Sequence, residues 1–193
     1  FFSKCMNVSS RQQRVVKDVQ AAQSEWNQLQ EQCCTLLSVV VRHYQQMDVL
    51  SNPHAQGVLA HIPQAIDLTK AKLLAEIDSA MKMVFSSLLE LGKIVKSFEQ
   101  AYLTGRDLYE CNKDRFENPE IRELPLPDDY LQFLQMNYKL HSLQYLQFKD
   151  TFNAFEHATS QKMRQALLQQ TLEPTYLRNL PPAPKAGAKR QSA

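Results

Sequence analysis

Apolar residues recur along the first quarter of the chain in steps of four and three positions. This spacing is a heptad seam, which is typical of a long helix that packs against its neighbours at a shallow angle. Ser9 or Ser10 offers an N-cap, and Pro53 prevents continuation, so we predict a helix over residues 9–51. The seam consists of Val15, Val19, Ala22, Trp26, Leu29, Cys33, Leu36, Val40, Met47 and Leu50.

Two further apolar series predict two more long helices. The second begins after Pro63, a residue suited to the first helical turn, and predicts a helix over residues 63–113. Asp128 and Asp129 offer an N-cap and favourable charge to a third helix over residues 128–172. The second series is Leu74, Ile77, Met81, Val84, Leu88, Leu91, Val95, Phe98, Tyr102, Gly105 and Tyr109, and the third is Leu131, Leu134, Tyr138, His141, Tyr145, Phe148, Phe152 and Phe155.

Helix-breaking residues fall between these series. The chain has only four glycines, and Pro119, Pro125 and Pro127 exclude a regular helix from the segment that must cross over to the third helix. We therefore predict an all-α fold, an elongated bundle of three long antiparallel helices with coiled-coil-like packing over residues 9–172. An N-terminal extension, residues 1–8, precedes it, and a disordered, proline-rich basic tail, residues 173–193, follows it.

Composition narrows the function classes. The 193 residues, 44% of them hydrophobic, suffice for one sizeable core. A net charge of +2 gives no broad basic field, so direct nucleic-acid binding is not predicted. The longest apolar run, Cys33 to Val41, is about half of the ~20 residues that span a bilayer, so no membrane helix is expected. The irregularly spaced cysteines indicate reduced, packed thiols in an intracellular protein.

Catalytic and metal-binding patterns are absent from the sequence. Di-iron helical proteins place Glu three residues before His, and none of the five histidines has this neighbour. A glycine-rich phosphate loop, a Gly-x-Ser-x-Gly elbow and paired-cysteine zinc spacing are also missing. We therefore expect no enzyme activity, no cofactor and no metal. One hypothesis stays open beside this expectation: the chain could be a helical enzyme or ligand carrier whose pocket forms only on folding. His141, on the third seam, is expected to be a hydrogen-bonded core or interface residue.

Aromatic residues indicate either a core or a partner-binding surface. Such side chains dominate both environments, and the glutamine-rich faces of the first and third helices suit either solvent or a covering subunit. Phe133, Leu140 and Leu143 lie off the main seam of the third helix, and a three-helix bundle has one interior, so this second stripe predicts a docking surface. The predicted partner-binding residues are Trp26, Phe133, Leu134, Tyr138, Leu140, Tyr145 and Phe148.

Two spacings add a family resemblance. The first helix contains Gln23-x-x-Trp26-x6-Cys33-x-x-Leu36-Leu37-Ser38, and the third contains Asp129-x-Leu131-x-Phe133-Leu134-Gln135-x9-Tyr145-Leu146-x-x-Lys149. The distance from Ser38 to Ile62-Pro63, and Lys70 and Lys72 in the second helix, agree with the same pattern. Over roughly residues 15 to 150, the chain resembles the AIRIM family of ribosome maturation factors.

The resemblance implies a non-enzymatic adaptor in the cytoplasm and nucleus. Its partners would be a hexameric AAA ATPase related to the spermatogenesis-associated ATPases and a second small helical subunit, the cyclin-dependent-kinase-interacting protein. The implied complex removes recycling factors from pre-60S ribosomal particles, with a further link to chromatin and replisome protein turnover. Because heptads alone fit other assemblies, the alternative is a structural coiled-coil subunit of a kinetochore or vesicle-tethering complex.

Overall fold

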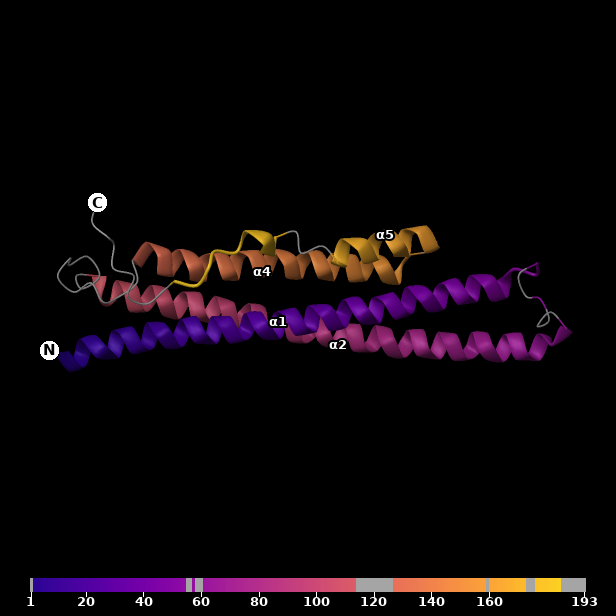
Figure 1. The fold of residues 1–193 in the computed structure, drawn as a ribbon, viewed down its shortest axis with the longest axis horizontal. Coiled ribbons are helices and arrows are strands. Elements are labelled where there is room, and N and C mark those ends of the chain that lie inside the picture. Colours follow the sequence, from indigo (N-terminus) through magenta and orange to yellow (C-terminus); the bar gives the residue numbers. More distant parts are fainter. Residues whose placement is uncertain are drawn as a thin grey trace. The chain divides into compact units, whose positions relative to one another are not determined.

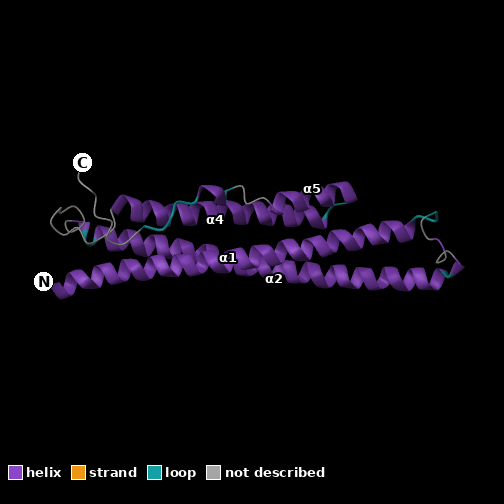
Figure 2. Ribbon diagram, viewed as in Figure 1, coloured by secondary structure: helices purple, strands orange, loops and turns teal. Residues whose placement is uncertain are grey.

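The computed structural model describes residues 2–54, 57, 61–113, 127–158, 160–172 and 176–184. Within these ranges the secondary structure is helical and contains no strand, which confirms the all-α prediction for the described part (Figures 1 and 2). The elements are α1 (Phe2–Ser51), α2 (Pro63–Glu110), α4 (Pro127–Glu156), α5 (Gln161–Leu172) and the short 3₁₀ helix η3 (Leu177–Asn179).

The helix bounds differ from the prediction at three places. Helix α1 begins at Phe2, because the first eight residues contain no proline or glycine to stop a helix before Ser9. Helix α2 ends at Glu110, and Cys111 and Asn112 form a turn. The predicted third helix is divided into α4 and α5, so the bundle of three long antiparallel helices is not confirmed.

The division between α4 and α5 has local causes. The Ala158 amide donates to Phe155 O at 3.2 Å, which closes a tight turn after α4. The Ser160 hydroxyl accepts a bond from the Met163 amide at 3.3 Å, as an N-cap does, and thereby starts α5. Arg164 then reaches back, donating from Nη2 to Ala158 O at 2.6 Å. These bonds satisfy backbone groups that an uninterrupted helix would satisfy by itself.

The chain folds into two compact units. Unit 1 contains Phe1–Asn27, Gly92–Tyr145 and Thr175–Ala193, and unit 2 contains Gln28–Leu91 and Leu146–Pro174. Helices α1, α2 and α4 therefore each contribute one part to unit 1 and another part to unit 2.

An aromatic layer joins the three helices of unit 1. The His141 ring of α4 lies between Trp26 of α1, at 4.9 Å and nearly perpendicular, and Phe98 of α2, at 4.2 Å. Gln23 donates to Asn137 Oδ1 at 2.6 Å, and three to four residues further along both helices Trp26 contacts His141, so α1 and α4 run in the same direction through this unit. These contacts hold α1, α2 and α4 together in unit 1 by both ring packing and hydrogen bonding.

Unit 2 joins α1 and α2 in opposite directions. Leu50 packs with Ile66 and Leu73 near the end of α1, and His43 Nε2 lies 3.2 Å from Glu76 Oε2 further back along it. Helix α5 lies on α1, because Cys34 donates to Thr171 O at 3.6 Å and Gln161 donates to Val41 O at 3.4 Å. In this unit α1 therefore contacts both α2 and α5.

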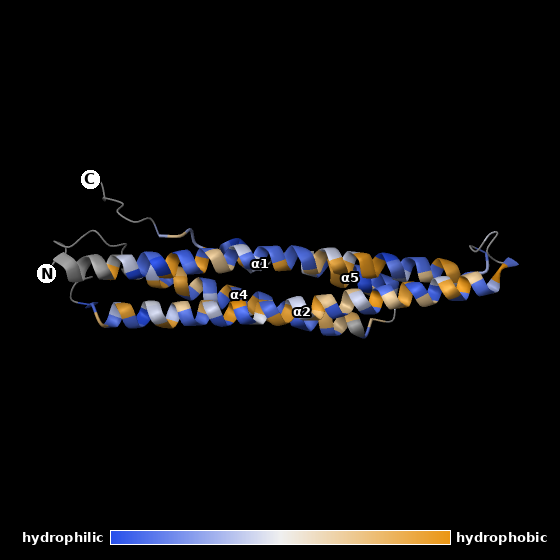
Figure 3. Ribbon diagram, turned by 90° about the horizontal axis from the view of Figure 1, so that it is seen from below, coloured by the Kyte–Doolittle hydropathy of each residue, from blue (hydrophilic) through white to orange (hydrophobic). Residues whose placement is uncertain are grey.

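The core-facing side of α2 differs from the predicted seam near its start. Leu73 and Ala80 are buried, whereas Leu74 is exposed and Met81 is half-buried. The adjacent leucines 73 and 74 fit either of two series with the same helical period, and packing in the folded chain buries the series that contains Leu73. Figure 3 shows hydrophobic positions recurring along α2.

Part of the predicted proline-rich tail contacts helix α4. Residues 176–184 belong to unit 1, and the Tyr176 amide donates to Gln144 Oε1 of α4 at 3.4 Å. Leu177, Leu180 and Pro181 are half-buried. Disorder of the tail stays a prediction, and residues 173–175 and 185–193, with the predicted crossover at 118–126, lie outside the described residues.

Candidate partner-binding site

Five of the seven predicted partner-binding side chains lie in the interior. Trp26, Phe133, Leu134, Leu140 and Phe148 are all less than 9% exposed. Their side chains already pack within the chain, so the predicted second surface stripe of α4 is wrong at Phe133 and Leu140. Binding of a partner by these five residues stays a prediction.

The chain itself covers Phe133 and Leu140 of the second stripe of α4, while Leu143 is exposed, and other residues of α4 contact the neighbouring elements. Leu134 and Tyr130 face Gly105 of α2, Asn137 bonds Gln23 of α1, and Gln144 receives the returning segment at Tyr176. No apolar periodicity predicts that segment, because it contacts α4 without forming a long helix. The predicted bundle of three helices therefore omitted one element that covers α4, the segment at Tyr176.

His141 is a hydrogen-bonded core residue, as predicted. Its Nδ1–H donates to Asn137 O at 2.8 Å, and its side chain is buried between Trp26 and Phe98. Burial lowers the pKa of His141 to about 4, while the bond to Asn137 acts weakly in the opposite direction. The imidazole is therefore neutral at physiological pH.

Tyr138, a predicted residue, borders a surface hollow of about 350 Å³ in unit 1. Its ring stacks on Tyr102 of α2 at 6.4 Å, and its hydroxyl donates to Glu99 Oε1 at 3.3 Å. The Glu99 carboxylate raises the pKa of Tyr138, since it disfavours a phenolate beside it. We call this hollow the tyrosine hollow; its lining is Tyr102, Gln135, Tyr138, Lys139, Ser142 and Leu143.

The tyrosine hollow combines apolar surface with polar groups at its edge. Leu143, predicted to lie off the main seam, is 37% exposed there, and Lys139 is exposed beside it. Tyr145, the seventh predicted residue, lies elsewhere: its side chain is half-buried beside Gly92. Sequence reasoning placed Tyr102 in the core seam and so missed its role in the hollow.

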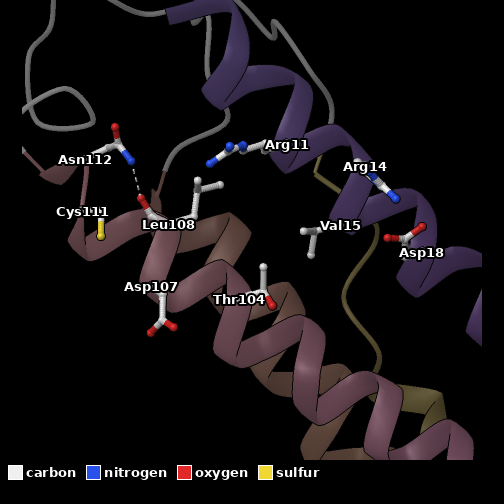
Figure 4. Close-up of a pocket in the computed structure, with 9 residues that line it drawn as sticks. All are labelled: Arg11, Arg14, Val15, Asp18, Thr104, Asp107, Leu108, Cys111 and Asn112. Carbon is white, nitrogen blue, oxygen red and sulfur yellow. Dashed lines mark hydrogen bonds between the residues drawn. The ribbon is translucent and has the colours of Figure 1, made fainter. Parts of the chain in front are cut away.

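A larger groove of about 530 Å³ lies between α1 and α2 in unit 1 (Figure 4). Arg11 and Arg14 of α1 line one wall, Asp107 of α2 lines the other, and Val15 and Leu108 supply apolar surface. Asp18 and Asp107 match the two arginines in number, so the groove carries no excess of either charge. It gives no electrostatic preference for an anionic ligand.

The described residues contain no cluster of three or more His, Cys, Asp or Glu side chains that could hold a metal ion. Cys33 and Cys34 are free and buried, and Cys111 is free and exposed. Burial raises the pKa of Cys33 to about 11 and also raises that of Cys34, so both thiols are protonated at neutral pH. A protonated, buried thiol is a poor nucleophile.

None of the described helices is long and apolar enough to cross a membrane.

Comparison with known protein families gives a match over most of the chain. The CA109-like family, described as "Ribosome biogenesis protein C1orf109-like", matches residues 6–180. The match includes most of the described part of both units. The searches of curated proteins and of solved structures found no match.

Proposed function

Since the chain belongs to the C1orf109-like family of ribosome biogenesis proteins, which is the AIRIM family, we propose that it is a non-enzymatic adaptor of an AAA ATPase. In this proposal the ATPase supplies the energy for releasing recycling factors from pre-60S particles, in the cytoplasm and with a nuclear pool. The chain binds the ATPase together with a second small helical subunit of the cyclin-dependent-kinase-interacting type.

The tyrosine hollow is the observation that supports an adaptor role best. Stacked tyrosines present a large, rigid apolar area with a hydroxyl at the edge, which is the composition of many interface hot spots. Leu143 adds exposed apolar surface, and Lys139 adds a charged rim. Of the predicted partner-binding residues, Tyr138 therefore has the surroundings best suited to contact another protein.

Native affinity purification of the tagged full chain, followed by mass spectrometry, tests this proposal. We expect the AAA ATPase, the second helical subunit and pre-60S proteins to co-purify. Replacing Tyr138 and Leu143 together by alanine should reduce ATPase recovery by about tenfold or more, because hot-spot truncations each cost on the order of 2 kcal/mol.

Leu146→Ala is the matched control, since Leu146 is a 54% exposed residue of α4 outside the hollow. This variant should recover the ATPase at the wild-type level, and circular dichroism should show equal helicity for all variants. Recovery of kinetochore or vesicle-tethering subunits in place of the ATPase would instead support the structural coiled-coil alternative.

A further inference from the structure

Helix α2 carries a second heptad series on a face that the described part of the chain leaves exposed to solvent. Its six members follow one another in steps of four, three, four, three and four residues, and all six are exposed. At about 100° per residue, this face lies roughly 150° around the helix from the buried one. We name it the outer face of α2; it consists of Ala71, Ala75, Asp78, Lys82, Phe85 and Leu89.

Large apolar side chains are concentrated at one end of the outer face. Phe85 is 53% exposed and Leu89 is 52% exposed, although Phe85 also contacts Phe152 of α4 with ring centroids 6.3 Å apart. Leu74, 49% exposed, lies on the flank of the other end, beyond the charged Asp78 and Lys82. Phe85 and Leu89, one helical turn apart, form an exposed apolar patch, and such a patch marks an interaction surface.

The opposite end of the outer face carries small side chains. Ala71 and Ala75 leave room above the helix backbone, while Asp78 and Lys82 occupy the middle. In the isolated chain Lys82 Nζ lies 2.6 Å from Asp78 Oδ2, and the two side chains are 75% and 65% exposed. An exposed pair of this type contributes little to folding, so both charges are available to a partner.

We propose that the outer face of α2 packs antiparallel against the outer face of a second copy of this chain. The register is fixed by placing Asp78 opposite Lys82 of the second copy. In this register Ala75, three residues before Asp78, lies opposite Phe85, three residues after Lys82. Ala71, four residues before Ala75, lies opposite Leu89, four residues after Phe85. Every layer therefore pairs either a small residue with a large one or an acid with a base.

Two-fold symmetry is what makes a second copy the fitting occupant. In a symmetric dimer each layer occurs twice, so one sequence must complement itself, and this sequence does so in both charge and size. A parallel, in-register pair would place Asp78 against Asp78 and Lys82 against Lys82, which repel. The charged layer thus also selects the antiparallel orientation.

Charge reversal tests the register on the purified full chain. Sedimentation velocity over a range of concentrations should show wild-type chain self-associating to a dimer. Asp78→Lys alone and Lys82→Asp alone should each weaken self-association by at least about tenfold, because symmetry repeats every like-charge contact. An equimolar mixture of the two variants should restore the dimer as a heterodimer, since each Lys then faces an Asp.

Asp150→Lys, the same chemical change at an exposed residue of α4, is the control and should leave self-association unchanged. A chain that sediments as a monomer at every concentration overturns the proposal. Dimers that either single reversal leaves intact, or a mixture that stays monomeric, also overturn it. The purified chain contains no ATPase, so this result is independent of the adaptor proposal.

Discussion

Individual polar residues occupy positions that an apolar seam would assign to aliphatic side chains. Asn137 and His141 are buried in α4 with their hydrogen bonds made, to Gln23, Phe133 O and Asn137 O. Gln12 is also buried, but its side-chain amide has no hydrogen-bond partner in the described part of the chain. Satisfied polar groups fix which helices meet, whereas an unsatisfied amide costs stability.

The buried imidazole of His141 predicts an acid-sensitive fold. Its pKa is about 4 in the folded chain, against a reference value of 6.5. As the pH falls below 6.5, the unfolded chain therefore binds a proton that the folded chain does not yet bind. Stability from this group is complete above pH 6.5 and is lost as pH falls toward 4. Between pH 7.5 and pH 5 the free energy of unfolding should fall by about 2 kcal/mol because of His141 alone.

Urea denaturation at the two pH values measures this loss. His141→Phe keeps an aromatic ring between Trp26 and Phe98 but cannot be protonated, so its free energy of unfolding should fall by about 2 kcal/mol less than that of wild type. The control, His157→Gln, removes an exposed histidine and should retain the wild-type pH dependence. Parallel losses for His141→Phe and wild type would contradict the prediction.

At the scale of helices, the heptad pattern predicts which segments are helical but not every face or boundary. Leu73 and Leu74 compete for the seam, and only packing against the other helices decides between them. The break after Glu156 depends on Ser160 as an N-cap and on Arg164 bonding to Ala158 O, contacts that no hydrophobic pattern contains. Tertiary contacts therefore supply the information that periodicity lacks.

Gly105 marks a close approach of α2 and α4, and it gives a prediction at this scale. A Cβ atom at Gly105 would lie 2.2 Å from Leu134 Cδ1 and 3.2 Å from the Tyr130 hydroxyl, and both neighbours are buried. Replacing glycine by alanine stabilises a helix by about 1 kcal/mol, but overpacking a core destabilises the fold by roughly 1–3 kcal/mol. We expect Gly105→Ala to lower the free energy of unfolding by about 1 kcal/mol.

Gly92→Ala is the comparison for Gly105→Ala in urea denaturation. Its Cβ would meet only the end of the half-buried Tyr145 side chain, nearest at the hydroxyl, 3.0 Å away. That side chain can shift, so the propensity gain should dominate and Gly92→Ala should be neutral or stabilising. Equal effects of the two substitutions would show that helix propensity, and not interhelical contact, governs both sites.

For the molecule as a whole, the sequence predicted the helical class and the family but not how the chain covers its own faces. Gln144 is buried because the segment from Tyr176 returns to α4, and proline-rich segments give no periodic signal of such a return. Hence Phe133 and Leu140, predicted as surface, are interior. Tyr138 is half-buried and borders the tyrosine hollow together with Tyr102.

Leu88 and Leu89 separate the folding of the chain from its proposed self-association. Leu88 is buried on the core side of α2, whereas the adjacent Leu89 is half exposed on the outer face. Leu88→Asp places an unpaired carboxylate in the core, a cost of several kcal/mol against a total stability of roughly 5–15 kcal/mol. We therefore expect circular dichroism to show extensive loss of helicity for Leu88→Asp.

Leu89→Asp makes the same chemical change one residue away and should keep wild-type helicity, because its carboxylate reaches water. In sedimentation velocity, however, Leu89→Asp should be monomeric, since the change replaces the large apolar side chain opposite Ala71 by a carboxylate that the dimer would remove from water. If Leu89→Asp also lost its helicity, the outer face would be part of the core. Retained helicity with an intact dimer would place the contact between copies elsewhere.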